Sequence, residues 1–136
     1  FSRFLLLFES DKGASVNLRM QMIADAIYYI DRAPILGHGL GSYGFVVYGT
    51  DFRAYPHNGF LEIWFEAGIV GLILFIAFIM MGLFAAMNRN YVVLACIIIF
   101  LTLNFLKSSS LDELRLLFLI CGFSAGFVVK GEEHKN

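Results

Sequence analysis

Apolar and polar residues are strongly segregated along this 136-residue chain. A short apolar stretch at residues 1–8 is followed by a more polar region that continues to about residue 59. Three long apolar stretches then follow, and short polar turns separate them. This pattern predicts a polar segment followed by consecutive apolar helices.

The apolar stretches have lengths typical of membrane helices. Residues 67–87 carry no charge, and a helix needs about 20 apolar residues to cross a bilayer. The uncharged stretch at 91–106 is a little short, and Arg89 and Lys107 can snorkel to the interface to make up the difference. The stretch at 116–129 is shorter still, so it either thins the bilayer or places Arg115, Asp112 and Glu113 near membrane depth. The predicted elements are a helix with a span at 60–87, spans at 91–106 and 111–130, and a solvated tail at 131–136.

The polar region, residues 9–59, contains one predicted helix. Apolar side chains recur every three or four residues from Met20 to Ile30, which indicates an amphipathic helix over about 17–32. Ser15 or Asn17 is the expected N-cap, and Pro34 ends the helix because the residue before a proline avoids helical geometry.

The rest of this region is predicted to be irregular. Residues 9–15, ESDKGAS, have the composition of a loop, and residues 45–52, FVVYGTDF, are expected to be extended or irregular. Residues 1–8 are too short to span a bilayer and are expected to end a membrane helix whose start is missing. We therefore expect the C-terminal part of a larger membrane protein, with a genuine short N-terminus as the alternative.

Composition agrees with a membrane protein of all-α class. The chain is 59% hydrophobic and only 15% charged, whereas soluble domains have about 25% charged residues. Its formal net charge of -1 and the absence of a basic stripe argue against nucleic-acid binding. Cys96 and Cys121 are isolated within apolar stretches, so they are expected to be small buried hydrophobes rather than metal ligands.

A glycine-rich turn at residues 35–45 contains a GxGxxG match, from Gly39 to Gly44. A dinucleotide site requires this motif between a strand and a helix, but here a helix and a proline precede it. The simpler interpretation is a turn in which the glycines permit positive φ angles and close backbone approach.

The stretch PHNGFLEIWFEAG carries the strongest candidate chemistry. Asn58 is a plausible N-cap for a helix that begins near Gly59, and Glu62 and Glu66 lie four residues apart on one face. His57 has two interpretations, a residue of the helix-start turn or a neutral imidazole that accepts a proton from an attacking hydroxyl. The two glutamates either orient the histidine and bind substrate or are interfacial polar residues.

Arginines in the polar region are candidates for an anionic substrate. Arg19 lies in the first turn of the predicted helix, where a cation opposes the helix dipole, and its planar guanidinium suits a diphosphate. Arg53 is a further substrate-binding candidate, and Arg32 and Arg115 are weaker ones. The alternative for each is a solvated surface residue.

The order of these motifs resembles the C-terminal half of the O-antigen ligase and polymerase family, over about residues 15–130. That pattern is an arginine, a Pro-x-x-Gly-x-Gly turn, His-Asn, Leu-Glu and a Glu-x-Gly-x-x-Gly that enters a membrane helix. The matching residues here are Arg19, Pro34, Gly37, Gly39, His57, Asn58, Leu61, Glu62, Glu66, Gly68 and Gly71.

The resemblance implies a metal-independent glycosyl transfer without a cofactor, on the outer face of the bacterial inner membrane. The donor is a glycan on undecaprenyl diphosphate, and the acceptor is a glycan or lipid A core. His57 is then the base, and Arg19 holds the diphosphate. The other implied partners are membrane lipids and other polysaccharide-assembly proteins, and a further essential arginine is expected earlier in the full protein.

The resemblance also decides the expected orientation of the multi-pass chain. Lysine and arginine counts alone place the long loop in the cytoplasm. The resemblance instead implies a periplasmic loop and a cytoplasmic tail. The alternative function is a non-catalytic membrane module of a polysaccharide export complex, and the sequence upstream of residue 1 would discriminate the two.

Overall fold

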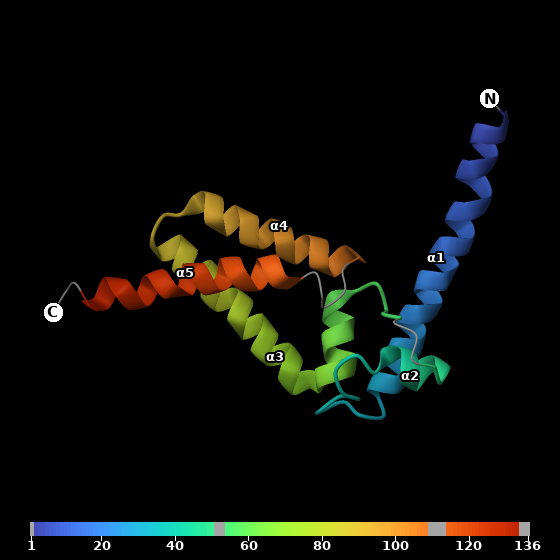
Figure 1. Cartoon of the computed structure of the whole chain (residues 1–136), viewed down its shortest axis with the longest axis horizontal. Coiled ribbons are helices and arrows are strands. Elements are labelled where there is room, and N and C mark those ends of the chain that lie inside the picture. The colour runs from blue at the N-terminus through green and yellow to red at the C-terminus, as the bar shows by residue number, and fades with distance from the viewer. Residues whose placement is uncertain (1, 51–53, 109–113, 134–136) are drawn as a thin grey trace.

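The computed structural model describes residues 2–50, 54–108 and 114–133, and helices joined by turns make up its regular structure (Figure 1). Within these ranges there is no strand, which confirms the all-helical prediction. The helices, in chain order, are α1 (Ser2–Ile30), α2 (Tyr43–Tyr48), α3 (Gly59–Asn88), α4 (Val92–Ser108) and α5 (Arg115–Glu133).

The first helix is longer than the sequence predicted. α1 continues without interruption through residues 9–15, so the predicted loop and the predicted caps at Ser15 and Asn17 are wrong. Gly13 in a helix interior costs only about 1 kcal/mol relative to alanine, and its neighbours tolerate the helix. α1 stops at Ile30, two residues before the predicted end near residue 32 and four residues before Pro34.

A second correction concerns residues 45–52, which were expected to be extended or irregular. Residues 43–48 form the short helix α2, which ends at Gly49 with φ 68°, and the Gly49 N–H donates to the Phe45 carbonyl. A left-handed glycine is a common way to end a helix. Tyr43 and Gly44 are buried, so packing overrides the β preference of the aromatic and β-branched residues here.

The third helix, α3, is broken at Gly68. Its φ of 67° and ψ of -172° are non-helical, and they divide α3 into residues 59–67 and 69–88. Figure 1 shows the sharp change of direction between the two parts. A break in a helix removes the intrahelical partners of backbone carbonyls before it and of N–H groups after it. These groups need other partners, particularly where water is scarce.

The glycine-rich turn supplies those partners. Two N–H groups of the turn donate to carbonyls before the break, and two carbonyls of the turn accept from N–H groups after it. The four bonds are His38 N to Phe65 O (2.9 Å), Gly39 N to Glu66 O (2.9 Å), Ile69 N to Pro34 O (2.9 Å) and Val70 N to Ile35 O (3.4 Å). The turn therefore supplies hydrogen-bond partners to the backbone groups on both sides of the break.

Close backbone approach explains two glycines of the motif. A Cβ on Gly37 would lie 2.4 Å from the Glu66 carbonyl oxygen, and one on Gly68 would lie 2.1 Å from the Ile35 carbonyl oxygen. Both glycines also have positive φ, 72° and 67°. The interpretation of the turn as a site of positive φ and close approach is confirmed.

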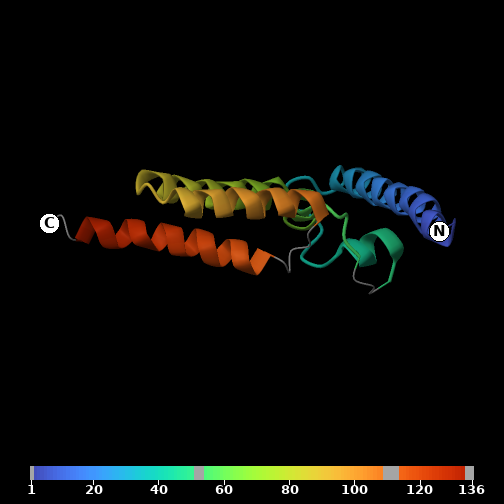
Figure 2. The ribbon, with the colours of Figure 1, turned by 90° about the horizontal axis from the view of Figure 1, so that it is seen from above.

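The second part of α3 packs with α4 and α5 into a small bundle around one hydrophobic cluster. In Figure 2 the bundle lies at one end of the molecule, and α1 and α2 lie at the other. The cluster contains Phe75, Ile98, Phe105, Leu117 and Cys121 among its buried members. The Ser124 hydroxyl donates to the Gly82 carbonyl at 2.8 Å, which ties α5 to α3.

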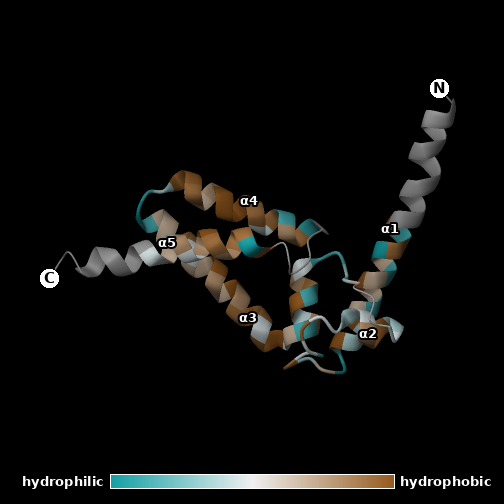
Figure 3. Ribbon diagram, in the orientation of Figure 1, coloured by the Kyte–Doolittle hydropathy of each residue, from teal (hydrophilic) through white to brown (hydrophobic). Residues whose placement is uncertain are grey.

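The bundle leaves much apolar surface uncovered, as Figure 3 shows by colour. Among the described residues, α3 is the one helix long and apolar enough to cross a membrane, and only 28% of its most apolar window is buried. Val92–Lys107 and Arg115–Gly126 are shorter apolar helices. A core helix of a water-soluble protein would be largely covered, so this exposure favours lipid as the surroundings of the bundle.

The start of α3 is fixed by a side-chain cap. Asn58 has extended geometry, with φ -146° and ψ 111°, and its Oδ1 accepts from the Leu61 N–H at 3.1 Å. The cap satisfies one of the N–H groups that a helix start leaves unpaired. The predicted cap and the predicted start near Gly59 are both confirmed.

Replacing Gly68 with alanine should strongly destabilise the protein. The added methyl would meet the Ile35 backbone, and the φ of 67° and ψ of -172° lie in a region almost restricted to glycine, which costs other residues on the order of 1–3 kcal/mol. We expect a clear fall in the thermal midpoint of the protein in detergent. Gly122→Ala is the matched control, because no atom lies within 4 Å of its added Cβ. Equal midpoints for the two variants would contradict the close approach.

Replacing Asn58 with alanine should loosen the first turn of α3 without unfolding the bundle. Loss of an N-cap costs about 1 kcal/mol, and Asn58→Ser should retain most of the stabilisation because serine also caps. Hydrogen exchange of the amides of residues 60–63 measures the effect. Unchanged exchange in Asn58→Ala would show that the cap does not hold this turn.

Candidate functional site

His57 lies immediately before α3 in a constrained backbone. It has a φ of 53°, in the left-handed region, and such positions are uncommon outside glycine. The buried Pro56 precedes it and the capping Asn58 follows it. The Tyr55 ring lies 4.5 Å from the imidazole, centroid to centroid. The surrounding residues therefore hold a conformation that an isolated chain would disfavour, a feature common at functional sites.

The environment of His57 favours the neutral imidazole. Burial lowers the pKa of His57 below its usual value, and the positive charge of Arg19 lowers it further. The Nδ1 atom is buried and makes no hydrogen bond to the described residues. Among the described residues, no carboxylate therefore orients the ring through this nitrogen, which was one role considered for Glu62 and Glu66.

Arg19 reaches the site from the middle of α1, where its side chain is exposed. It is separated from His57 by the end of α1, the glycine-rich turn and α2, yet its charge acts on the imidazole. The two candidates thus lie within electrostatic range of each other. Because α1 continues past residue 17, Arg19 is an interior residue of a helix and not part of its first turn.

The two glutamates are buried rather than solvated. Glu62 is 6% exposed and Glu66 is 4% exposed, so both carboxylates lie within the fold. The Gly41 backbone acts on the Glu66 carboxylate, whose buried Oε2 has no hydrogen-bond partner among the described residues. The glycine-rich turn thus contacts Glu66 through both its backbone and its side chain.

Of the remaining candidate arginines, the structure describes Arg32 and Arg115. Arg53 lies outside the described residues. The Arg32 guanidinium stacks over Tyr28, at 4.4 Å from the ring centroid, and donates to the Tyr28 hydroxyl. Arg115 is exposed at the start of α5. Arg32 is therefore engaged in a cation–π contact with the Tyr28 ring.

Two site residues had no signal in the sequence. His38 Nε2 is 2.8 Å from the Tyr29 carbonyl oxygen, and its ring lies 4.8 Å from the Phe65 ring, centroid to centroid. The Tyr43 hydroxyl donates to the Met22 carbonyl at 2.8 Å. These contacts join residues far apart in the chain, so helical periodicity and short motifs cannot reveal them.

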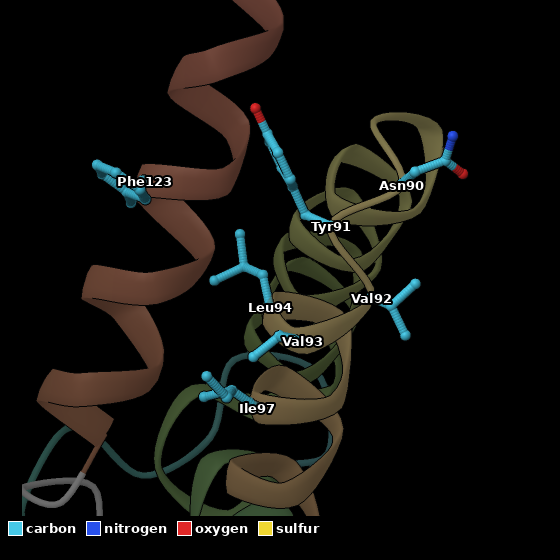
Figure 4. Close-up of a pocket in the computed structure, with 7 residues that line it drawn as sticks. All are labelled: Asn90, Tyr91, Val92, Val93, Leu94, Ile97 and Phe123. Atoms are coloured by element: carbon cyan, nitrogen blue, oxygen red, sulfur yellow. The ribbon is translucent and has the colours of Figure 1, made fainter.

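A cavity of about 540 Å³ lies elsewhere, between the start of α4 and α5 (Figure 4). Leu94 and Ile97 point toward α5, whereas Asn90 and Val92 point away. The lining is almost wholly apolar, and its residues belong to the end of the bundle remote from His57. We therefore place the candidate site at His57 rather than at this cavity. Among the described residues, no three His, Cys, Asp or Glu side chains are grouped to hold a metal.

The comparisons with known proteins identify the family. Residues 1–76 match the family model described as O-antigen ligase, a range that ends within α3 and stops short of the residue 130 expected from the resemblance. Neither the curated proteins nor the solved structures gave a match. The matched range exceeds half of the 136 residues and includes Arg19, the glycine-rich turn and His57. The chain belongs to the O-antigen ligase family.

Proposed function

We propose that this chain is the C-terminal part of a glycosyltransferase of bacterial surface-polysaccharide assembly. It transfers a glycan from undecaprenyl diphosphate to a sugar hydroxyl, as an O-antigen polymerase or ligase. The observation that supports the proposal is the constrained His57 at the start of α3, which lies with Arg19 in the region that the family model matches and whose pKa is lowered by burial and by the charge of Arg19. A guanidinium and a neutral imidazole are the groups that a diphosphate leaving group and an attacking hydroxyl require.

The reaction exchanges one glycosidic bond for another. The acceptor hydroxyl oxygen forms a bond to the anomeric carbon of the donor glycan, and the bond from that carbon to the diphosphate oxygen breaks. His57 takes the proton of the acceptor hydroxyl, and Arg19 stabilises the charge that develops on the departing diphosphate. The depressed pKa of His57 supports this role, because the imidazole is then neutral at physiological pH.

Buried glutamates beside the helix break are further substrate-binding candidates. A buried carboxylate oxygen without a partner, such as Oε2 of Glu66, can accept a hydrogen bond from a sugar hydroxyl. Glu62, one turn earlier, lies on the same side of α3. Arg53 is retained as a candidate for the diphosphate on the basis of the sequence alone.

We propose that the apolar bundle lies in the inner membrane. About twenty residues follow the break at Gly68, which gives roughly 30 Å of helix, the thickness of a hydrocarbon core. In this arrangement α4 and α5 are further membrane helices, α1, the turn and α2 lie on the periplasmic side, and the tail is cytoplasmic. His57 then stands at the membrane surface, within reach of the head group of a lipid-linked donor.

His57→Ala in the full-length protein should abolish long-chain polysaccharide. Loss of a general base typically reduces a rate by about 10²- to 10⁴-fold. Gel profiles of surface polysaccharide measure this, with expression and membrane insertion checked by immunoblot. Long-chain product at the original level would refute the catalytic role and favour a non-catalytic module of an export complex.

Arg19 variants should separate charge from geometry. Arg19→Lys keeps a positive charge but loses the planar fork, so we expect at least about tenfold lower activity with the acid limb of the pH profile unmoved. Arg19→Gln removes the charge that lowers the pKa of His57, so the acid limb of kcat/KM should move to higher pH. An acid limb at the same pH in both variants would contradict the pairing.

A further inference from the structure

The glycine-rich turn exposes large apolar side chains and is free of charged residues. Ile35, Leu36 and Leu40 are 62%, 75% and 82% exposed. Residues 33–50 contain no Asp, Glu, Lys or Arg, so no charged side chain favours water around this segment. Exposed apolar surface of this kind marks contact with a partner or a membrane.

Hydrogen bonds place the turn at the beginning of the apolar span of α3. The Pro34 carbonyl accepts from the Ile69 N–H at 2.9 Å, and the Ile35 carbonyl accepts from the Val70 N–H at 3.4 Å. Both donors follow the break at Gly68 directly, and the apolar part of α3 continues from there. Figure 1 shows the turn beside this break. The turn therefore lies level with the start of the span and not beyond it.

The end of α4 gives a second marker of the same depth. The Phe60 ring, in the part of α3 before the break, lies 5.6 Å from the Phe105 ring of α4, centroid to centroid. Phe105 is two residues from Lys107, the basic residue in the last turn of α4. A lysine at the end of a membrane helix extends to the bilayer interface. The part of α3 that binds the turn is therefore at interfacial depth.

The backbone of the turn suits a region that is poor in water. Its Gly37 N–H donates to the Ala33 carbonyl at 3.0 Å, and its His38 and Gly39 N–H groups donate to the carbonyls before the break. The His38 side chain also makes an internal contact, because Nε2 is 2.8 Å from the Tyr29 carbonyl oxygen. Hydrogen-bonded backbone can lie at the membrane surface, where water still reaches the remaining polar groups.

We infer that Ile35, Leu36 and Leu40 insert among the acyl chains of the outer leaflet, beside the start of the α3 span. Their surface continues that of the span, where Val70 and Ile73 are 44% and 58% exposed. The inference rests on the membrane placement in the proposed function but not on its chemistry. Anchoring of the turn in lipid fixes the height of the α3 start, which carries His57, above the bilayer.

The test uses nitroxide labels on the full-length protein in phospholipid nanodiscs, with no donor added. Single cysteines are introduced by Leu36→Cys and Leu40→Cys, with the other cysteines replaced by alanine. Ile73→Cys is the control for a lipid-facing position, and Asn17→Cys, on an exposed position of α1, is the control for water. Electron paramagnetic resonance measures collisions with oxygen, which concentrates among acyl chains, and with a water-soluble nickel chelate.

The labels at positions 36 and 40 should collide more with oxygen than with the chelate, as the label at position 73 does and the label at position 17 does not. Chelate collisions as frequent as at position 17 would overturn the inference. Exclusion of both reagents would also overturn it, because another segment of the protein would then cover the turn.

The control at position 73 separates this inference from the proposed function. If its label also reports water, the membrane placement fails and the inference fails with it. If it reports lipid while the labels at positions 36 and 40 report water, only the inference fails. The catalytic roles of His57 and Arg19 are decided by the activity of their own variants.

Discussion

The structure depends on how a broken helix satisfies its backbone. Gly68 interrupts α3, and the glycine-rich turn provides hydrogen-bond partners for both sides of the break. An unpaired buried backbone group costs about as much as a lost hydrogen bond. These four hydrogen bonds therefore fix the position of the turn against α3. Glycine at positions 37 and 68 allows the two backbones to approach, and larger residues would prevent it. Gly37 and Gly68 thus serve a close contact between two backbone segments.

Placement of the turn determines what else meets at the start of α3. The turn follows α1 and leads into α2, so fixing it brings both helices against residues 59–67. Tyr43 and His38 complete this arrangement through carbonyls of α1. As a result Arg19 acts on His57, which a proline, a cap and a left-handed backbone already constrain. In the proposed reaction, these contacts would hold the guanidinium and the imidazole in place, whereas a flexible surface loop would not.

Sequence reasoning succeeded where the information is local. The Asn58 cap, the end of α1 before Pro34 and the apolar helices follow from short-range patterns. It failed at residues 9–15, where a loop-like composition was overridden by a helix that continues through it. It also failed at residues 45–52, where burial outweighs the strand propensity of the side chains. The break at Gly68 was also missed, because its partners lie some thirty residues earlier. Motif order suggested His57 and Arg19, whereas their proximity required the fold.

A structure of the full-length protein in a nanodisc with its lipid-linked donor bound is the most direct test of the central claim. That claim is that the closed helix break assembles Arg19 and His57 into one site. We predict that the donor diphosphate contacts the Arg19 guanidinium and that the anomeric carbon faces His57. The turn should remain hydrogen-bonded to both sides of the break at Gly68. A diphosphate bound away from both residues, with the same pairing intact, would contradict the account.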